Sequence, residues 1–153
     1  MKTLIIAATL GVATAPAIAQ EGGITRNGSQ TATIGAEDLF TGTALVEPVF
    51  GTNENRPFST GKVTFLPGAR SNWHTHPNGQ TLVVTSGTGW TQEEGGERQV
   101  INAGDVVWCP PGVRHWHGAT DTTAITHLAI QQVEGDTAVE WMEPVTDEQY
   151  LGQ

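Results

Sequence analysis

The sequence predicts a single all-β domain, built as an antiparallel sandwich or barrel. Nine short runs with strand-like composition follow one another along most of the chain, and turn signals separate them. The 153 residues include 19 glycines and 8 prolines, a composition that favours turns over long helices. No apolar pattern with a helical period extends beyond two turns. The length suits one hydrophobic core and is short for two.

The predicted strands are short and closely spaced. They cover residues 44–50, 62–66, 71–76, 81–85, 89–92, 98–101, 106–109, 115–119 and 124–133. Clear turn signals fall at Pro67-Gly68, Pro77-Asn78-Gly79, Ser86-Gly87 and Pro110-Pro111-Gly112. One short helix is predicted over residues 147–151, with Asp147 as its N-cap.

The first 19 residues have the pattern of a cleavable export signal. Lys2 supplies the positive start, residues 4–12 the apolar run, and Ala17-Ile18-Ala19 the cleavage site. The apolar run is too short to cross a membrane. A buried N-terminal strand is the alternative interpretation. We therefore expect a periplasmic or secreted protein with a polar arm over residues 20–36 and a folded domain over residues 37–153.

The charge and the cysteine content exclude several classes of protein. The formal net charge is −9 and no basic cluster occurs, which argues against nucleic acid and anionic membranes as partners. Cys109 is the sole cysteine, so no disulfide can form within the chain. We expect it to be a small buried side chain at the end of a strand.

Four residues form a candidate metal site: His74, His76, Gln80 and His115. Imidazoles two residues apart project to the same face of a β-strand, where side chains alternate with period two. The turn after His76 returns the chain so that Gln80 can approach the same ion. His115 comes from a separate strand about 35 residues later. The spacing thus predicts one metal ion on the inner face of a sheet.

Two strings around these residues resemble the two signature motifs of the cupin superfamily. The first runs from Gly68 through His74, His76 and Gln80 to Gly87, and the second runs from Gly104 through Pro110-Pro111-Gly112 to His115. Gln80 replaces the usual glutamate, and Ala119 stands where the second motif often ends in asparagine. The resemblance implies a cupin-type jelly-roll β-barrel that binds one divalent metal ion inside the barrel.

The ligand types bear on the chemistry of the ion. Three neutral imidazoles and a neutral amide leave a divalent ion with its full positive charge, which a glutamate would have reduced. The ion should therefore attract anionic ligands strongly and act as a Lewis acid. Imidazole and carbonyl oxygen suit Mn, Fe, Co, Ni or Zn.

Two further histidines are candidate catalytic residues. His117 shares the inward phase of His115, and His127 lies in a strand whose inner side should face the same cavity. A nearby dication favours neutral imidazole, which suits a general base, although each could instead be a core histidine. Arg70 and Arg114 are predicted to be solvated charges at strand ends. Trp73, Thr75 and Trp116 fall on the opposite phase and should face away from the ion.

A closer resemblance covers the chain from about residue 38 to residue 150. Segments 40–43, 67–70, 73–77, 79–82, 115–119, 126–131 and 146–150 resemble the bacterial cupin-type hydroxynitrile lyases. That family cleaves cyanohydrins such as (R)-mandelonitrile to an aldehyde and HCN, and carries manganese. The resemblance implies that His74, His76, Gln80 and His115 hold Mn²⁺ and that His127 handles the hydroxyl proton. The positive charge would then stabilise either the alkoxide or the departing cyanide.

Two other functions remain open on the sequence. A cupin dioxygenase would use the same ligands to engage O₂ and a ring-bearing substrate. A non-enzymatic periplasmic module would bind a small polar or anionic ligand. In each case the partner is a small molecule, and we expect a dimer or tetramer of identical chains because exposed apolar strand residues could supply an interface.

Overall fold

The structure is a computed structural model that describes residues 22–153. The predicted export signal lies outside the described residues. Within them, the strands are β1 (Thr33–Ile34), β2 (Phe40–Thr41), β3 (Ala44–Phe50), β4 (Phe58–Phe65), β5 (Arg70–Ser71), β6 (His74–Thr75), β7 (Gln80–Glu93), β8 (Gln99–Asn102), β9 (Val106–Cys109), β10 (His115–Ala119), β11 (Ile125–Gln132) and β12 (Glu140–Trp141). A short helix, α1 (Asp147–Leu151), follows. The all-β expectation is confirmed.

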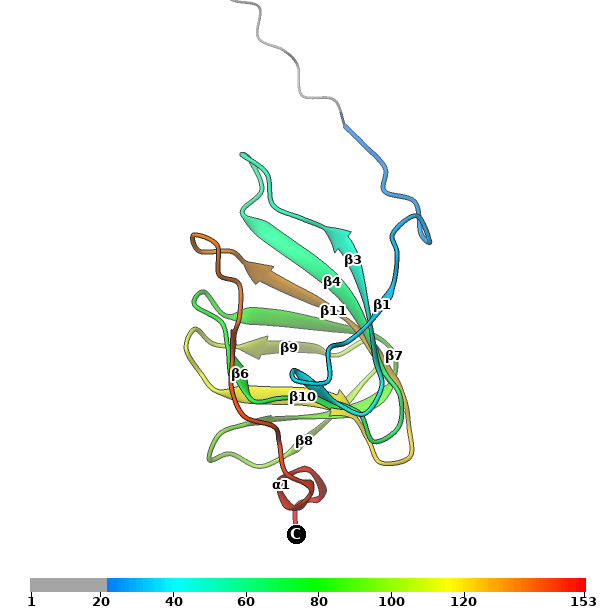
Figure 1. Cartoon of the computed structure of the whole chain (residues 1–153), viewed down its shortest axis with the longest axis vertical. Coiled ribbons are helices and arrows are strands. Elements are labelled where there is room, and N and C mark those ends of the chain that lie inside the picture. The colour runs from blue at the N-terminus through cyan, green and yellow to red at the C-terminus, as the bar shows by residue number, and fades with distance from the viewer. Residues whose placement is uncertain (1–21) are drawn as a thin grey trace, which may run out of the picture.

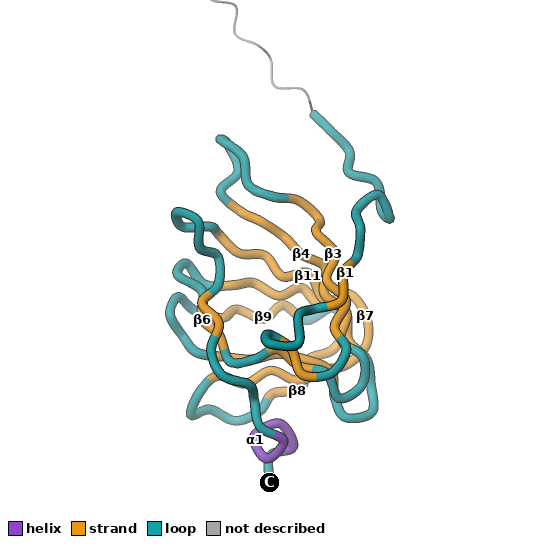
Figure 2. The backbone as a smooth tube through the Cα atoms, viewed as in Figure 1, coloured by secondary structure: helices purple, strands orange, loops and turns teal. Residues whose placement is uncertain are grey.

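The strands form two antiparallel sheets that curl around a common interior (Figure 1). The first sheet has the order β1-β3-β4-β11-β7-β9. The second contains β2, β5, β10, β7 and β8, and β6 joins it between β10 and β12. Figure 2 shows how loops connect the strands at both ends of this curved wall. The architecture is the jelly roll expected from the sequence.

The long strand β7 belongs to both sheets because it bends at Gly87. Its first half pairs with β11 and β9, and its second half pairs with β10 and β8. Gly87 has φ +79°, and a Cβ there would lie 2.0 Å from the carbonyl oxygen of Ala124. Only glycine fits this bend. The prediction of a turn at Ser86-Gly87 between two strands was therefore wrong, since the chain bends there without leaving the ladder.

The predicted strand over residues 71–76 is also interrupted. Asn72 and Trp73 separate β5 from β6, because their backbone N–H groups bond outside the ladder. Asn72 donates to the carbonyl of Leu39 (2.9 Å) and Trp73 to that of Glu143 (3.1 Å). The partner strand β12 was not predicted. It pairs with β6 and places Trp141 opposite His74.

Two apolar clusters stabilise the sheets. The larger one lies between the sheets and includes Phe65, Val84 and Ile125. The second lies on the other side of the second sheet and combines Trp73, Trp116, Val145 and Tyr150. Trp116 thus faces away from His115 on β10, and Trp73, just before β6, faces away from His74, as predicted from the alternation of side chains. Cys109 is buried as expected, at 2% exposure, and burial raises the pKa of its thiol to about 12.

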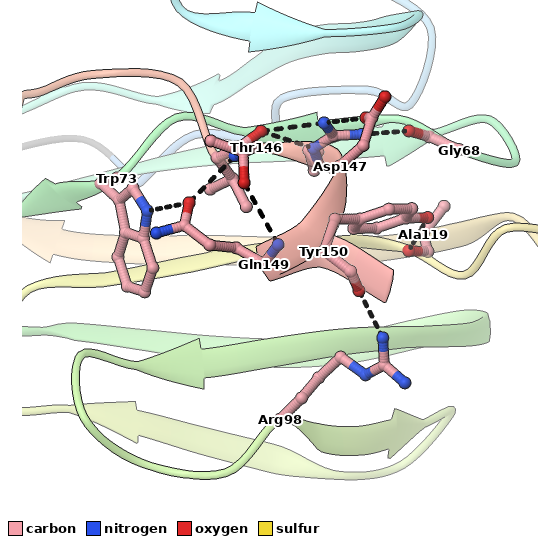
Figure 3. Close-up of polar contacts among 10 residues, drawn as sticks. Gly68, Trp73, Arg98, Ala119, Thr146, Asp147, Gln149 and Tyr150 are labelled. Carbon is pink, nitrogen blue, oxygen red and sulfur yellow. Dashed lines mark hydrogen bonds and ion pairs between the residues drawn. The ribbon is translucent and has the colours of Figure 1, made fainter. Parts of the chain in front are cut away.

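Arg70 anchors α1 to the second sheet, which contradicts its prediction as a solvated charge. Figure 3 shows Thr146, Asp147, Gln149 and Tyr150 in this part of the chain. It is 5% exposed, and its guanidinium donates to the carbonyl of Val145 and to Asp147 at 2.8 and 2.7 Å. The same group lies 4.4 Å from the ring centroid of Tyr150. The helix begins after Thr146, whose hydroxyl accepts from the N–H of Gln149. Asp147 is therefore not the N-cap but the first helical residue, and it pairs with Arg70.

Arg114 is likewise held by ion pairs. It contacts Glu94 at 2.7 Å and also Glu143, and its side chain is 23% exposed. Its two ion pairs therefore link the segment after β12 to the second sheet. Among residues 22–153, no helix has the length and apolar character that a membrane span requires.

Candidate metal centre

Three of the predicted ligands, His74, His76 and His115, converge in the interior. His74 lies on β6 opposite His115 on β10, and their ring centroids are 4.3 Å apart. His76 follows β6, with its ring 5.1 Å from that of His74 and 5.5 Å from that of His115. None of the three is more than 2% exposed. Their convergence is what the strand spacing predicted.

Backbone carbonyls fix the orientation of all three imidazoles. Each Nδ1 lies within hydrogen-bond distance of one carbonyl oxygen: His74 with Asn72 (2.9 Å), His76 with Ala138 (2.6 Å) and His115 with Val113 (2.9 Å). A carbonyl oxygen only accepts, so each Nδ1 carries the proton and each Nε2 presents a lone pair. This arrangement is typical of histidines that bind a metal ion.

Burial keeps these imidazoles neutral. It lowers the pKa of His76 to about 4 and the pKa of His74 and His115 below the usual value. Repulsion from the positive charges that His115, His76 and His127 would carry if protonated lowers the pKa of His74 further. All three are therefore ready to donate lone pairs at neutral pH.

Gln80, the fourth predicted ligand, faces His115 across the same interior. Its Oε1 lies 3.4 Å from His115 Nε2, and its Nε2 donates to Gln131 Oε1 at 3.1 Å. The facing atoms are both acceptors with no proton between them, because the imidazole proton is on Nδ1. The buried Nε2 of His76 likewise has no hydrogen-bond partner. A cation bound among these atoms would satisfy their lone pairs, so the residues present fit a divalent metal ion.

His117 lies next to this group and could take the place of His76. Ring nitrogens of His74, His115 and His117 all lie within 4.8 Å of one another. However, Nδ1 of His117 is 3.1 Å from Nε2 of His127, another imidazole, so no carbonyl fixes which nitrogen carries the proton. His76 has the carbonyl partner that the other two histidines share. Because its tautomer is fixed in the same way, His76 is the better candidate for the third imidazole ligand. Nε2 of His117 then has no hydrogen-bond partner.

His127 is buried behind His117. It is 0% exposed, and its ring packs against Phe65 with centroids 5.8 Å apart. The inward side of β11 faces the cavity as predicted, since Ala129 and Gln131 line it. His127 on that side lies deeper and does not line the cavity, whereas His117 does. The two imidazoles form a pair, with His117 as its inner member.

A cavity of about 140 Å³ opens beside the histidines. Its polar end is lined by His74, His76, Gln80, His117 and Gln131. Its walls are mainly apolar and come from Phe40, Val46, Val63, Ala129, Val139 and Trp141. An apolar protein cavity of about 150 Å³ can bind benzene, so this one suits a single aromatic ring.

Sequence reasoning did not identify Gln131, Phe40 or Trp141 as lining residues. Gln131 shares the strand phase of His127 and Ala129 on β11, and this alternation could have indicated it. Trp141 had no such signal, because its two-residue strand carries no periodic pattern.

Comparison with known proteins identifies the family. A model of the cupin domain matches residues 61–130. Over 127 residues the chain is 56% identical to an (R)-mandelonitrile lyase from Granulicella tundricola, covering 83% of this chain and 97% of the relative. The chain belongs to the cupin family. This cupin also resembles a solved cupin-like protein from Thermotoga maritima at 39% identity and a TM-score of 0.73, over 86% of this chain and 96% of that one.

More distant structures share the fold of this cupin. A polyketide cyclase from Streptomyces resistomycificus aligns with a TM-score of 0.68 at 14% identity, over 85% of this chain and 91% of that one. Identity this low shows the jelly roll alone. The match to the family model ends at residue 130, so Ala138 and Trp141 lie beyond it.

The buried histidines should make the metal-free protein sensitive to acid. Burial lowers the pKa of His127 to about 4, so the unfolded chain binds more protons between pH ~6.5 and ~4. The contribution of neutral His127 to the free energy of unfolding is therefore fully present above pH ~6.5. It is lost as the pH drops towards 4, and for His127 alone the loss is on the order of 3 kcal/mol. We expect the Tm of the metal-free protein to fall over this window, measured by calorimetry. A constant Tm between pH 7 and 4.5 would contradict the prediction.

Proposed function

We propose that this cupin is a metal-dependent hydroxynitrile lyase that cleaves cyanohydrins such as (R)-mandelonitrile to an aldehyde and HCN, and forms them in reverse. The relative from Granulicella tundricola carries the name of that enzyme and is 56% identical. The observation that carries the proposal is the cavity, in which unpaired buried lone pairs adjoin apolar walls sized for one aromatic ring.

We assign the metal to His74, His76, Gln80 and His115, and we propose Mn²⁺. Imidazole nitrogen and amide oxygen accept Mn, Fe, Co, Ni or Zn, and the resemblance to the manganese-dependent lyases selects Mn. When bound, the ion supplies a positive charge that stabilises negative charge developing on the substrate. No ligand in this set is a carboxylate, so none cancels that charge.

The protein's own proton acceptor in this proposal is His117. Its Nε2 has no hydrogen-bond partner, and the residue lines the cavity. A neutral imidazole at this position can take the hydroxyl proton of a cyanohydrin as the carbon–carbon bond to cyanide breaks. The proton returns to cyanide, which leaves as HCN.

His127 then acts as a positioning residue. Its Nε2, 3.1 Å from Nδ1 of His117, accepts the Nδ1 proton and so keeps a lone pair on Nε2 of His117. It also stabilises the positive charge on His117 once the substrate proton has been taken. The apolar walls of the cavity strengthen these interactions by excluding water.

Elemental analysis combined with an HCN-release assay tests the proposal. We expect about one Mn²⁺ per chain and release of HCN from (R)-mandelonitrile by the metal-loaded protein, without oxygen consumption. Oxygen uptake with a ring-bearing substrate would instead indicate a dioxygenase. Small-ligand binding with no turnover in a broad substrate screen would indicate a binding module.

Replacing Gln80 with glutamate tests the role of the ion's charge. Gln80→Glu should retain one metal per chain and reduce kcat for HCN release by about tenfold or more, because a carboxylate cancels part of the charge that stabilises the reaction. Metal content and kcat are measured on the same preparation. Gln99→Glu, which adds the same charge at an exposed residue of β8, should leave kcat unchanged. An unaltered kcat in Gln80→Glu would contradict the charge argument.

We also propose that the protein is exported and forms a homo-oligomer, either a dimer or a tetramer. The signal-like residues 1–19 support export. Val106 and Trp108 on β9 are 65% and 55% exposed, and such apolar strand residues suit an interface between identical chains. Cell fractionation with N-terminal sequencing tests the first proposal, and light scattering tests the second.

A further inference from the structure

The segment that follows the cupin match forms one wall of the cavity. β12 pairs with β6, and this pairing places Trp141 directly opposite His74. The two rings are 4.9 Å apart between centroids. Trp141 also contacts Phe40 edge-on, with centroids 5.5 Å apart and planes at 66°. These two side chains are the aromatic, non-histidine residues of the cavity wall.

The backbone around Trp141 is held in place on both sides. Met142 donates its N–H to the carbonyl of Trp73 at 2.9 Å, and the Asn72 side chain donates to the carbonyl of Met142 at 3.1 Å. Further along, the Arg70 guanidinium donates to the carbonyl of Val145 at 2.8 Å. These hydrogen bonds fix the backbone that carries the Trp141 ring at the cavity wall.

Trp141 is a large wall residue whose side chain can be made smaller without opening the apolar core. Phe40 packs against Phe65 in the larger apolar cluster, with centroids 5.9 Å apart, so its loss would disturb the sheets. Trp141 is half-buried and lies outside both clusters. Trp141 also lines the cavity, where a substrate ring could pack against it at the centroid separations of roughly 4.5–7 Å that aromatic pairs prefer.

We propose that Trp141 determines substrate specificity, and that it restricts the cavity to substrates with a single aromatic ring. The inference rests on the proposed lyase function and adds the residue that limits how large an aryl group the cavity accepts. The indole limits the depth of the cavity and packs against the ring of the substrate beside His74. A fused two-ring substrate collides with it.

Cyanohydrin synthesis with two aldehydes tests this role. Wild type, Trp141→Phe and Trp141→Ala are compared on benzaldehyde and 2-naphthaldehyde, with metal content measured for each. We expect Trp141→Ala to shift the kcat/KM ratio towards 2-naphthaldehyde by about tenfold or more, and Trp141→Phe to shift it less. Phe58→Ala removes an exposed aromatic side chain outside the cavity and should leave the ratio unchanged. An unchanged ratio in both Trp141 variants, with metal retained, overturns the proposal.

A binding measurement separates this inference from the lyase proposal. Benzyl alcohol and 2-naphthylmethanol are titrated into the metal-loaded wild type and Trp141 variants and followed by NMR. If the wild type releases no HCN from any cyanohydrin, the lyase function fails, but a shift in relative affinity towards the naphthyl probe in Trp141→Ala still supports Trp141 as the size-limiting residue. Equal relative affinities in wild type and variants overturn it. Should Trp141→Ala fail to fold, Trp141→Phe provides the comparison.

Discussion

His115→Ala is expected to lose the bound metal ion and, with it, HCN release. His115 is the proposed ligand that β10 contributes opposite β6, and its Nε2 faces Gln80 Oε1 at 3.4 Å. Replacing a group that only orients a ligand already costs about 10–100-fold in metal affinity. Removing a ligand itself should therefore cost more than about a hundredfold. Mn²⁺ titration and elemental analysis after dialysis measure this loss.

A matched set of variants identifies the third imidazole ligand. His76→Ala should lose metal to a similar degree as His115→Ala, whereas His127→Asn should keep one ion per chain. If His76→Ala retains the ion and His117→Ala loses it, then the ligand set is His74, His115 and His117 instead. Full metal content in His115→Ala would refute the site itself.

His117→Asn is expected to lower kcat for HCN release by about 10²–10⁴-fold while the metal remains bound. The asparagine amide takes the position of Nδ1 and can still reach His127. The substitution eliminates Nε2, the atom of His117 that has no hydrogen-bond partner at the cavity. The loss should therefore appear in kcat, since the proton acceptor is gone while the apolar walls that bind the substrate are intact. Steady-state kinetics on metal-loaded protein provide the measurement.

His127→Asn separates positioning from direct proton transfer. We expect a smaller loss of kcat than for His117→Asn, an unchanged KM, and a displaced pH–rate profile, because the partner of His117 Nδ1 has been changed. The assignment would be reversed if His127→Asn abolished turnover and His117→Asn left it at the wild-type level. Such a result would return the role of proton acceptor to His127, as the family resemblance implied.

Local sequence rules were sufficient where a single strand or turn decided the outcome. The alternation of side chains correctly put His74 on the face opposite Trp73, and His115 on the face opposite Trp116. The same rules failed at Gly87, where a turn signal marks a bend inside one continuous strand. Whether a glycine ends a strand or bends it depends on the approach of Ala124, which is distant in sequence.

The ion pair of Arg70 shows a second kind of limit. An arginine beside a predicted strand is ordinarily solvated, and nothing near it in the sequence indicates burial. It is buried because α1 returns across the second sheet and supplies Asp147, the carbonyl of Val145 and the ring of Tyr150. These partners lie more than 70 residues away, with Asp147 separated from Arg70 by 77 residues and Val145 by 75.

The sequence by itself determined the all-β class and the cupin signature, and it supplied the residues of the proposed metal site. Periodicity and motif spacing are local properties, and they carry this information directly. Only the tertiary structure decided that His117 stands between His127 and the cavity, that carbonyls fix three tautomers, and that Trp141 closes one wall. Each of these depends on which distant backbone lies beside a given side chain, and that is settled by the packing of the two sheets and the C-terminal segment.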